Sequence, residues 1–253
     1  MELIPLTPHT GYTIYRHATD RPNLGYIRGG NYALMFDAGA SPKHVRGYYA
    51  ALERAGEKLP DLVALSHWHW DHSFGMCAIE APVIASRLSH DTLVSMQRWE
   101  WDDASRRARV DSGEDALFGY DMIKREYGDC TTVRVVPADI VFDGTLTLDL
   151  GGVAVELIHI GGPHSVDSVV CYVPSDRFIF LGDSNGKDLL GLPWHYDPEH
   201  PEKLLETFNA LPYDPVKRDA YMGVLEGLDF THCIGGHADP MTRDELFRSL
   251  SDR

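Results

Sequence analysis

Residues 66–75, SHWHWDHSFG, carry three histidines and one aspartate within six positions, directly after the apolar run LVAL. A short apolar run of this kind predicts a buried strand, so His67, His69, Asp71 and His72 are expected where that strand ends. Neutral imidazoles and a carboxylate suit a borderline-soft divalent cation. Four donors so close together in the chain do not spread around one tetrahedral ion, which indicates two metal ions and further ligands elsewhere.

Trp68 and Trp70 alternate with these side chains. In an extended chain, successive residues point to opposite sides, so both tryptophans are expected opposite His67, His69 and Asp71. Two interpretations remain open at this point. Either the rings pack on neighbouring elements of the core, or they line the mouth of a pocket and contact the substrate.

Three further side chains of metal-binding type follow apolar runs later in the chain. His164 lies in the loop of HIGGPHS, Asp183 ends RFIFLGD, and His237 follows the glycine pair of THCIGGH. Open α/β sheets place their ligand sites at the carboxyl ends of strands. His232 competes with His237, but the glycine pair favours His237 because it lets the backbone approach a site closely.

Short β-rich runs alternate with helical patterns along the chain, which predicts an α/β architecture. The runs expected to be strands are TGYTIYR, YALMFDAG, DLVALSH, APVIAS, VRVVPADIVF, LTLDLGGVAVELIHIG, SVVCYVP and RFIFLGDS. The segments expected to be helices are residues 41–56, begun by Ser41 and Pro42, residues 201–211, and residues 242–252, capped by Thr242 with Glu245 three positions later.

Residues 88–127 form a long charged segment that contains Trp99, Trp101 and Phe118. Its pattern predicts helices interrupted by a loop near DSGED. Long insertions between core strands often carry specificity. The segment is therefore expected either to pack on the core as an amphipathic insertion, or to cover a substrate or form a dimer contact.

The chain of 253 residues has a formal charge of −15. This argues against a nucleic-acid partner, because such proteins usually carry a basic surface. No run approaches the ~20 apolar residues that cross a bilayer, and the N-terminus lacks the pattern of a signal peptide. These features predict a cytoplasmic protein that acts on a small molecule and has no membrane partner.

The order H-x-H-x-D-H, a loop histidine, a Gly-Asp pair and a late Gly-Gly-His resembles the metallo-β-lactamase-fold superfamily, from about Tyr26 to His237. The resemblance implies one domain over residues 1–253, built as a four-layer αβ/βα sandwich with a helical insertion at residues 88–127. It also implies a dinuclear centre in a cleft along one edge of the sandwich. The implied ligands are His67, His69 and His164 at site one, Asp71, His72 and His237 at site two, and Asp183 bridging the two ions.

Two adjacent ions share a water and lower its pKa enough to hold a bridging hydroxide near neutral pH. The resemblance therefore implies a metallo-hydrolase that cleaves an ester, thioester, lactone or phosphoester, in which Asp71 orients the hydroxide and Asp183 bridges the ions. Thioesterases of the glyoxalase II type and lactonases share this ligand set. The ions are expected to be zinc, with iron or manganese as alternatives.

Further expectations concern the surroundings of the centre. Ser66 and Ser165 are expected to fix the imidazoles. The candidate substrate contacts are His195, Tyr196, Trp68 and Trp70. The alternative function is an iron-dependent oxidoreductase similar to the sulfur dioxygenases of the same superfamily, and a homodimer is also expected.

Overall fold

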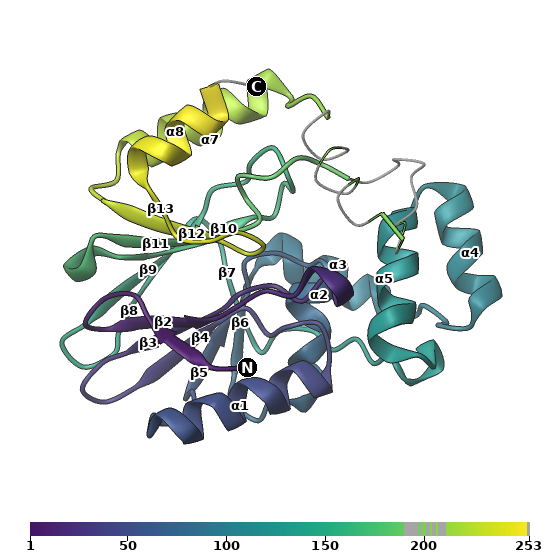
Figure 1. The fold of residues 1–253 in the computed structure, drawn as a ribbon, viewed down its shortest axis with the longest axis horizontal. Helices are drawn as coiled ribbons and strands as arrows, with labels where there is room; N and C mark the ends of the chain where they lie inside the picture. Colours follow the sequence, from purple (N-terminus) through teal and green to yellow (C-terminus); the bar gives the residue numbers. More distant parts are fainter. Residues whose placement is uncertain (190–196, 198, 201–202, 204–205, 207–210, 252–253) are drawn as a thin grey trace.

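The computed structural model of the chain describes residues 1–189, 197, 199–200, 203, 206 and 211–251. In this part of the chain two β-sheets pack face to face (Figure 1). The strand order of the first sheet is β1 (Leu3–Pro5), β2 (Thr10–Thr13), β3 (Leu24–Arg28), β4 (Ala33–Phe36), β5 (Leu62–Ala64), β6 (Val83–Ser86) and β7 (Ile140–Phe142). The strand order of the second sheet is β13 (Met241–Thr242), β12 (His232–Gly235), β11 (Phe178–Gly182), β10 (Val169–Val173), β9 (Ala154–His159) and β8 (Thr145–Asp149).

Parallel strands within each sheet bring distant segments of the chain to matching ends. β4, β5, β6 and β7 run parallel to one another, and β11 runs parallel to β12. The loops that follow β4 and β5 therefore leave the first sheet at one end, and the loops that follow β11 and β12 leave the second sheet together. The predicted metal ligands lie in several of these loops.

Alternating side chains on the strands build the layers. In β10, Val169 and Cys171 pack with residues of the first sheet, whereas Val170 and Tyr172 pack with the helices behind the second sheet. One buried apolar cluster thus lies between the sheets and one lies behind each sheet. The three clusters separate four layers, which confirms the predicted αβ/βα sandwich.

Helices cover the outer face of each sheet (Figure 1): α1 (Pro42–Ala55) lies behind the first, and α7 (Pro215–Glu226) and α8 (Arg243–Ser251) lie behind the second. The predicted caps are confirmed. The Ser41 side chain accepts a hydrogen bond from His44 N at 3.1 Å. Thr242 and Glu245 cap each other, with Thr242 N donating to Glu245 Oε2 at 2.8 Å and Glu245 N donating to Thr242 Oγ1 at 3.2 Å.

The predicted helical insertion consists of α3 (Arg87–Met96), α4 (Asp103–Ser112) and α5 (Leu117–Tyr127). The break near DSGED is confirmed, because Gly113 ends α4 in the left-handed region with a φ of 81°. The insertion packs on the core through the buried rings of Trp101 and Phe118. Arg21 Nη2 also lies 2.6 Å from Glu126 Oε1, and this buried ion pair ties α5 to the N-terminal part of the chain.

Some predicted elements differ in the structure. The run LTLDLGGVAVELIHIG forms the hairpin β8–β9, which turns at Gly151 and Gly152 with φ of 96° and 85°. Within VRVVPADIVF only β7 is a strand, since Pro137 offers no N–H to a ladder. The sequence predicts neither the strands β1, β3 and β13 nor helix α7, whereas β12 is the apolar run that ends in the glycine pair of THCIGGH. The predicted helix at residues 201–211 lies mostly outside the described residues.

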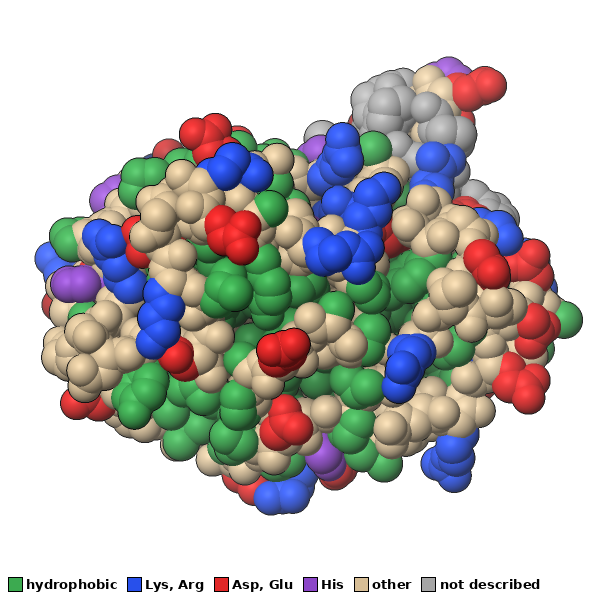
Figure 2. All heavy atoms as spheres, turned by 90° about the horizontal axis from the view of Figure 1, so that it is seen from below, with side chains coloured by type: hydrophobic (Ala, Val, Ile, Leu, Met, Phe, Trp, Pro, Cys, Tyr) green, Lys and Arg blue, Asp and Glu red, His purple; other side chains and the backbone are tan. Residues whose placement is uncertain are grey.

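No helix in the described ranges is both long and apolar enough to cross a membrane. Figure 2 shows the face that is seen from below Figure 1, where acidic side chains are scattered among hydrophobic and polar ones and several basic side chains adjoin one another above the centre. The excess negative charge of the chain is therefore not gathered on this face.

Candidate metal centre

The motif after β5 is extended only as far as His69 and then becomes helical. The short helix α2 (Trp70–Ser73) begins there, and the N–H groups of His72 and Ser73 both donate to His69 O at 3.1 Å. This turn brings Asp71 Oδ2 to 3.1 Å from His72 Nε2. The prediction of strict alternation is thus wrong beyond His69, because local hydrogen bonds close a helical turn at that point.

Three histidines form the first cluster of ligand atoms. His67 and His69 come from the loop after β5, and His164 comes from the loop after β9. His164 Nε2 lies 2.9 Å from His69 Nδ1, while the Lys187 carbonyl lies 2.8 Å from His164 Nδ1 and fixes that ring. One ring nitrogen of each histidine lies within 4.8 Å of the others. Three converging nitrogen donors are a common arrangement around zinc.

Two carboxylates and two histidines form the second cluster. His237 Nε2 lies 2.9 Å from Asp71 Oδ2 and 3.5 Å from Asp183 Oδ2. His72 Nε2 lies 3.5 Å from Asp183 Oδ1. One ligand atom from each of the four side chains lies within 4.8 Å of the others. This cluster offers a mixed nitrogen and oxygen donor set.

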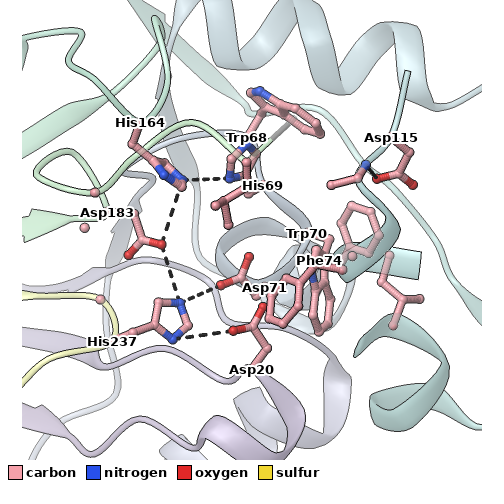
Figure 3. A pocket seen from close by; sticks show the side chains of 18 of the residues that line it. Asp20, Trp68, His69, Trp70, Asp71, Phe74, Asp115, His164, Asp183 and His237 are labelled. Atoms are coloured by element: carbon pink, nitrogen blue, oxygen red, sulfur yellow. Dashed lines mark hydrogen bonds and ion pairs between the residues drawn. The ribbon is translucent and has the colours of Figure 1, made fainter. Parts of the chain in front are cut away.

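Asp183 contacts both clusters (Figure 3). Besides its contacts in the second cluster, its Oδ2 lies 3.9 Å from His164 Nε2 of the first. Asp183 follows directly after β11, where Gly182 has a left-handed φ of 54° and where a Cβ would collide with Ser66. The tight glycine turn therefore holds the Asp183 carboxylate between the two groups of histidines.

The structure distinguishes His237 from its competitor His232. His232 is exposed on β12, and its Nδ1 lies 3.1 Å from Thr231 Oγ1. His237 reaches the cluster because Gly236 passes close to it, and a Cβ on Gly236 would lie 2.8 Å from His72 Cε1. The argument from the glycine pair therefore selects the histidine that the fold brings to the site.

Two aspartates that the sequence analysis misses support these histidines. Asp37, directly after β4, is buried and accepts hydrogen bonds from His72 Nδ1 at 2.8 Å and from Ser66 N at 2.7 Å. Asp20, after the short 3₁₀ helix η1 (His17–Thr19), has its Oδ1 3.7 Å from His237 Nδ1. Asp37 could have been found from the sequence, because it directly follows the apolar run of β4. No sequence pattern marks Asp20.

Of the two serines expected to fix the imidazoles, one does so. Ser66 Oγ lies 2.9 Å from His67 Nδ1. The prediction that Ser165 fixes an imidazole is wrong, because its hydroxyl donates to Asp167 instead. Asp167 in turn accepts a hydrogen bond from Trp68 N at 2.9 Å and so connects the loop of Ser165 to the histidine motif.

The electrostatic environments of the two clusters differ. Burial and the neighbouring histidines lower the pKa of His67 well below its ordinary value and that of His69 to about 3, so both rings are neutral. In the second cluster burial opposes the charged form, but the surrounding carboxylates raise the pKa of His72 well above its ordinary value and that of His237 to about 9. Burial also opposes ionisation of Asp183, yet His237 and His72 hold its pKa well below the usual range.

The donor set fits a pair of cations on two observations. Nε2 of His67 is buried and has no hydrogen-bond partner among the described residues, although buried polar atoms nearly always have one. Nε2 of His72 is also buried and makes no hydrogen bond there, only ion-pair contacts with Asp71 and Asp183. Asp20, Asp71 and Asp183 line the cavity at the centre, and its described lining includes neither lysine nor arginine. Buried carboxylates need compensating charge. Metal cations would supply that charge and would bind the lone pairs of these two nitrogens.

The centre opens into a cavity of about 290 Å³ (Figure 3). Trp68 and Trp70 both line this cavity beside the ligand residues. Trp70 also packs on Phe74, with ring centroids 6.4 Å apart, so this ring both packs on a neighbouring residue and lines the cavity. The candidate contacts His195 and Tyr196 lie outside the described residues.

Replacing Asp37 by alanine is expected to weaken metal binding about 10–100-fold, the usual effect of losing a carboxylate that orients a metal-binding histidine. The change removes the acceptor of His72 Nδ1 but replaces none of the predicted ligands. Titration with a competing chromophoric chelator measures the affinity. Asp143→Ala, which removes an exposed partner of Arg87, is the matched control. Unchanged affinity in a folded Asp37→Ala protein would contradict the positioning role.

Comparisons with solved structures agree with this architecture. A metallo-beta-lactamase from Pontibacter korlensis is 17% identical, with a TM-score of 0.58, over 99% of this chain and 97% of that chain. The DIM-1 metallo-beta-lactamase is 15% identical, with a TM-score of 0.62, over 99% and 96%. A sec-alkylsulfatase from Pseudomonas sp. is 17% identical, with a TM-score of 0.64, over 98% of this chain but 40% of that chain. At these identities the likeness shows the fold alone.

Sequence comparison supplies the family. No curated protein matches the sequence. The family model of the metallo-beta-lactamase superfamily matches residues 18–228, a range that contains every predicted ligand except His237. The matched range covers most of the chain, and it agrees with the sandwich of two sheets and with the position of the histidine motif after β5. The chain therefore belongs to the metallo-beta-lactamase superfamily.

Proposed function

We propose that the protein is a hydrolase that uses two divalent metal ions to cleave an ester, thioester, lactone or phosphoester bond of a small molecule. The observation that carries the proposal is the convergence of seven ligand side chains in two adjoining clusters, with Asp183 in contact with both. The proposed ligands of the first ion are His67, His69 and His164, those of the second are Asp71, His72 and His237, and Asp183 bridges the two. Imidazole and carboxylate donors favour zinc, with iron or manganese as alternatives.

Bound divalent ions would supply Lewis acidity and would lower the pKa of a water molecule, which makes a nucleophile available near neutral pH. The protein's own groups act around that chemistry. His67 and His69 stay neutral because of burial, which is the form that binds metal. Asp71 and Asp183 stay ionised, because neighbouring histidines hold their pKa low although burial opposes it.

Asp71 and Asp183 are the proposed catalytic carboxylates. Asp71 lines the cavity, and its Oδ2 is already in contact with His72 Nε2 at 3.1 Å and His237 Nε2 at 2.9 Å. Its other oxygen can accept a hydrogen bond from the nucleophilic water and orient it toward the substrate. Trp68 and Trp70 are the proposed substrate contacts from the motif, since both rings line the same cavity.

Metal analysis of the purified protein tests this proposal most directly. We expect two equivalents of zinc, together with turnover of at least one member of an ester, thioester, lactone and phosphodiester panel. Removing the metal with a chelator is expected to lower the rate on the order of a thousandfold, and added zinc is expected to restore it. One equivalent of redox-active iron, with oxygen consumption and no hydrolysis, would replace the proposal with an oxidoreductase.

Thioesterases of the glyoxalase II type and lactonases are the branches of the superfamily that the proposed ligand set fits. The single domain over residues 1–253, the cytoplasmic location and the homodimer stay predictions. The panel distinguishes the branches, because a thioesterase and a lactonase prefer different members of it.

A further inference from the structure

The cavity beside the metal centre has an aromatic wall drawn from two parts of the chain. The motif and the residues after it supply Trp68, Trp70 and Phe74, while the insertion supplies Trp99, Trp101 and Phe118. The rings hold one another in place. Phe74 and Trp101 meet edge to face with centroids 5.2 Å apart, and Trp99 and Trp101 are 5.9 Å apart. The insertion therefore forms part of the cavity wall as well as packing on the core.

Apart from histidines, the charged side chains in the described lining of this cavity are all acidic. Its described lining contains Asp20, Asp71, Asp115 and Asp183 and neither lysine nor arginine. Histidine apart, a sulfate or carboxylate on the non-reacting part of a substrate would find no cationic side chain in the described part of this wall.

Three of these aspartates lie at the metal centre, but Asp115 does not. Figure 3 shows Asp115 across the cavity from Asp183 and His237. Its Oδ1 accepts a hydrogen bond from Ala116 N at 2.8 Å. Among the residues that the structure describes, its Oδ2 has no hydrogen-bond or ion-pair partner. One oxygen of this carboxylate is thus open to a ligand in the cavity.

The charges of two arginines of the insertion, Arg106 and Arg109, act on Asp115, but among the described residues neither forms an ion pair with it, and Nε of both and Nη2 of Arg109 have no hydrogen-bond partner there. Arg106 Nη1 lies 3.5 Å from Asp103 Oδ1. Arg109 Nη1 donates to Glu100 O at 2.9 Å, and its guanidinium stacks on the ring of Trp99 at 4.4 Å. Neither arginine lines the cavity.

Burial raises the pKa of Asp115 to about 6, against the hydrogen bond from Ala116 N and the charges of Arg109 and Arg106. The carboxylate is therefore ionised at pH 8 without a close cationic partner. Asp115 is half-buried at the cavity wall, so its charge is only partly solvated there and is available to a cationic ligand.

We propose that the cavity binds a substrate whose non-reacting part is an apolar or aromatic group ending in a protonated amine, with the amine against Asp115 and the apolar part between the rings. This inference rests on the proposed function in so far as the bound amine is a substrate. The binding of the amine itself does not require turnover. A carboxylate forms its strongest hydrogen bonds with a cationic partner. The faces of tryptophan rings also attract ammonium groups, and a chain with a net charge of −15 attracts cations over a longer range.

The test uses the metal-loaded protein at pH 8 and two probes of equal length, 4-phenylbutylammonium and 4-phenylbutanol. Calorimetry and quenching of the cavity tryptophans both report binding. We expect the wild-type protein to bind the ammonium probe about tenfold or more tightly than the alcohol, the usual strength of a charge-assisted hydrogen bond. Asp115→Asn, which keeps the acceptor for Ala116 N, is expected to bind both probes equally and to bind the alcohol within twofold of wild type.

Glu114→Gln is the matched control, because Glu114 is exposed, adjacent in sequence and outside the cavity lining. It is expected to keep the preference for the ammonium probe. Equal binding of the two probes by the wild-type protein, or a preference that survives Asp115→Asn, would overturn the proposal. A preference for the ammonium probe without hydrolysis of any panel member would sink the proposed function and leave the binding site standing.

Thermal unfolding at pH 8 separates a binding role of Asp115 from a structural one. Because the folded-state pKa of about 6 exceeds the ordinary value of 3.8, ionisation disfavours the folded state at every pH above about 6. Asp115→Asn is therefore expected to raise Tm by about 5 °C. A Tm that is unchanged or lower would show that the carboxylate serves the fold, and would count against the proposal.

Discussion

Replacing Asp183 by asparagine is expected to lower kcat on the order of a thousandfold and to reduce the bound metal below two equivalents. Asp183 is the side chain that contacts both clusters, with its oxygens 3.5 Å from His72 Nε2, 3.5 Å from His237 Nε2 and 3.9 Å from His164 Nε2. Asparagine keeps the volume but removes the negative charge and one acceptor oxygen, so the two ions lose the anion that they share. The fold is expected to survive, because the change adds no bulk.

Metal analysis and steady-state kinetics on the best panel substrate measure this effect. Asp229→Asn is the matched control, since Asp229 is an exposed aspartate that pairs with Arg177 away from the centre. It is expected to keep both ions and the wild-type rate. A variant Asp183→Asn that retained two equivalents of metal and full activity would refute the bridging role.

The second large effect is expected from Gly236→Ala. A Cβ at this position would lie 2.8 Å from His72 Cε1 and would also collide with the Asp183 carboxylate. Both side chains must shift to admit it, and a displacement of about 1 Å in a catalytic group lowers the rate about a hundredfold. The pair Gly236 and His237 lies in the loop after β12, so the disturbance is local.

Gly223→Ala provides the control for this methyl group, because nothing lies within 4 Å of the Cβ that it would add in α7. It is expected to keep the wild-type activity and to be as stable or slightly more stable, since alanine favours a helix over glycine. Circular dichroism checks the folding of both variants. Normal metal content and normal rate in Gly236→Ala would mean that the centre tolerates the displacement of His72 and Asp183.

The sequence predicts the layers of the fold well because its central strands are buried on both faces and so form continuous apolar runs. The runs that became β4, β10 and β11 are short, apolar and bounded by polar or small residues. It fails where a strand is less apolar, as in β3 with Gly25, or where a glycine pair reverses the chain between β8 and β9. Pairing with a neighbouring strand, which is a long-range interaction, decides those cases.

The candidate ligands were predictable because each follows a strand in the sequence. His164, Asp183 and His237 are far apart in the chain but follow β9, β11 and β12, three strands of the second sheet that run in the same direction and end at the same edge. Asp20 was not predictable, because it lies in an irregular loop and reaches His237 only through the fold. The proposed binding role of Asp115 was not predictable for the same reason. It depends on the aromatic cavity that α5 and the histidine motif line together.

By itself, the sequence determined the alternation of strands and helices, the helical insertion and the residue types that can hold metal ions, because these are properties of local order along the chain. Only the tertiary structure decided which oxygen of Asp183 faces which histidine, that Asp37 rather than Ser165 orients an imidazole, and that Trp68 and Trp70 share a cavity with the insertion. These facts depend on distances between segments that pack together only after both sheets have formed, and no local pattern encodes such distances.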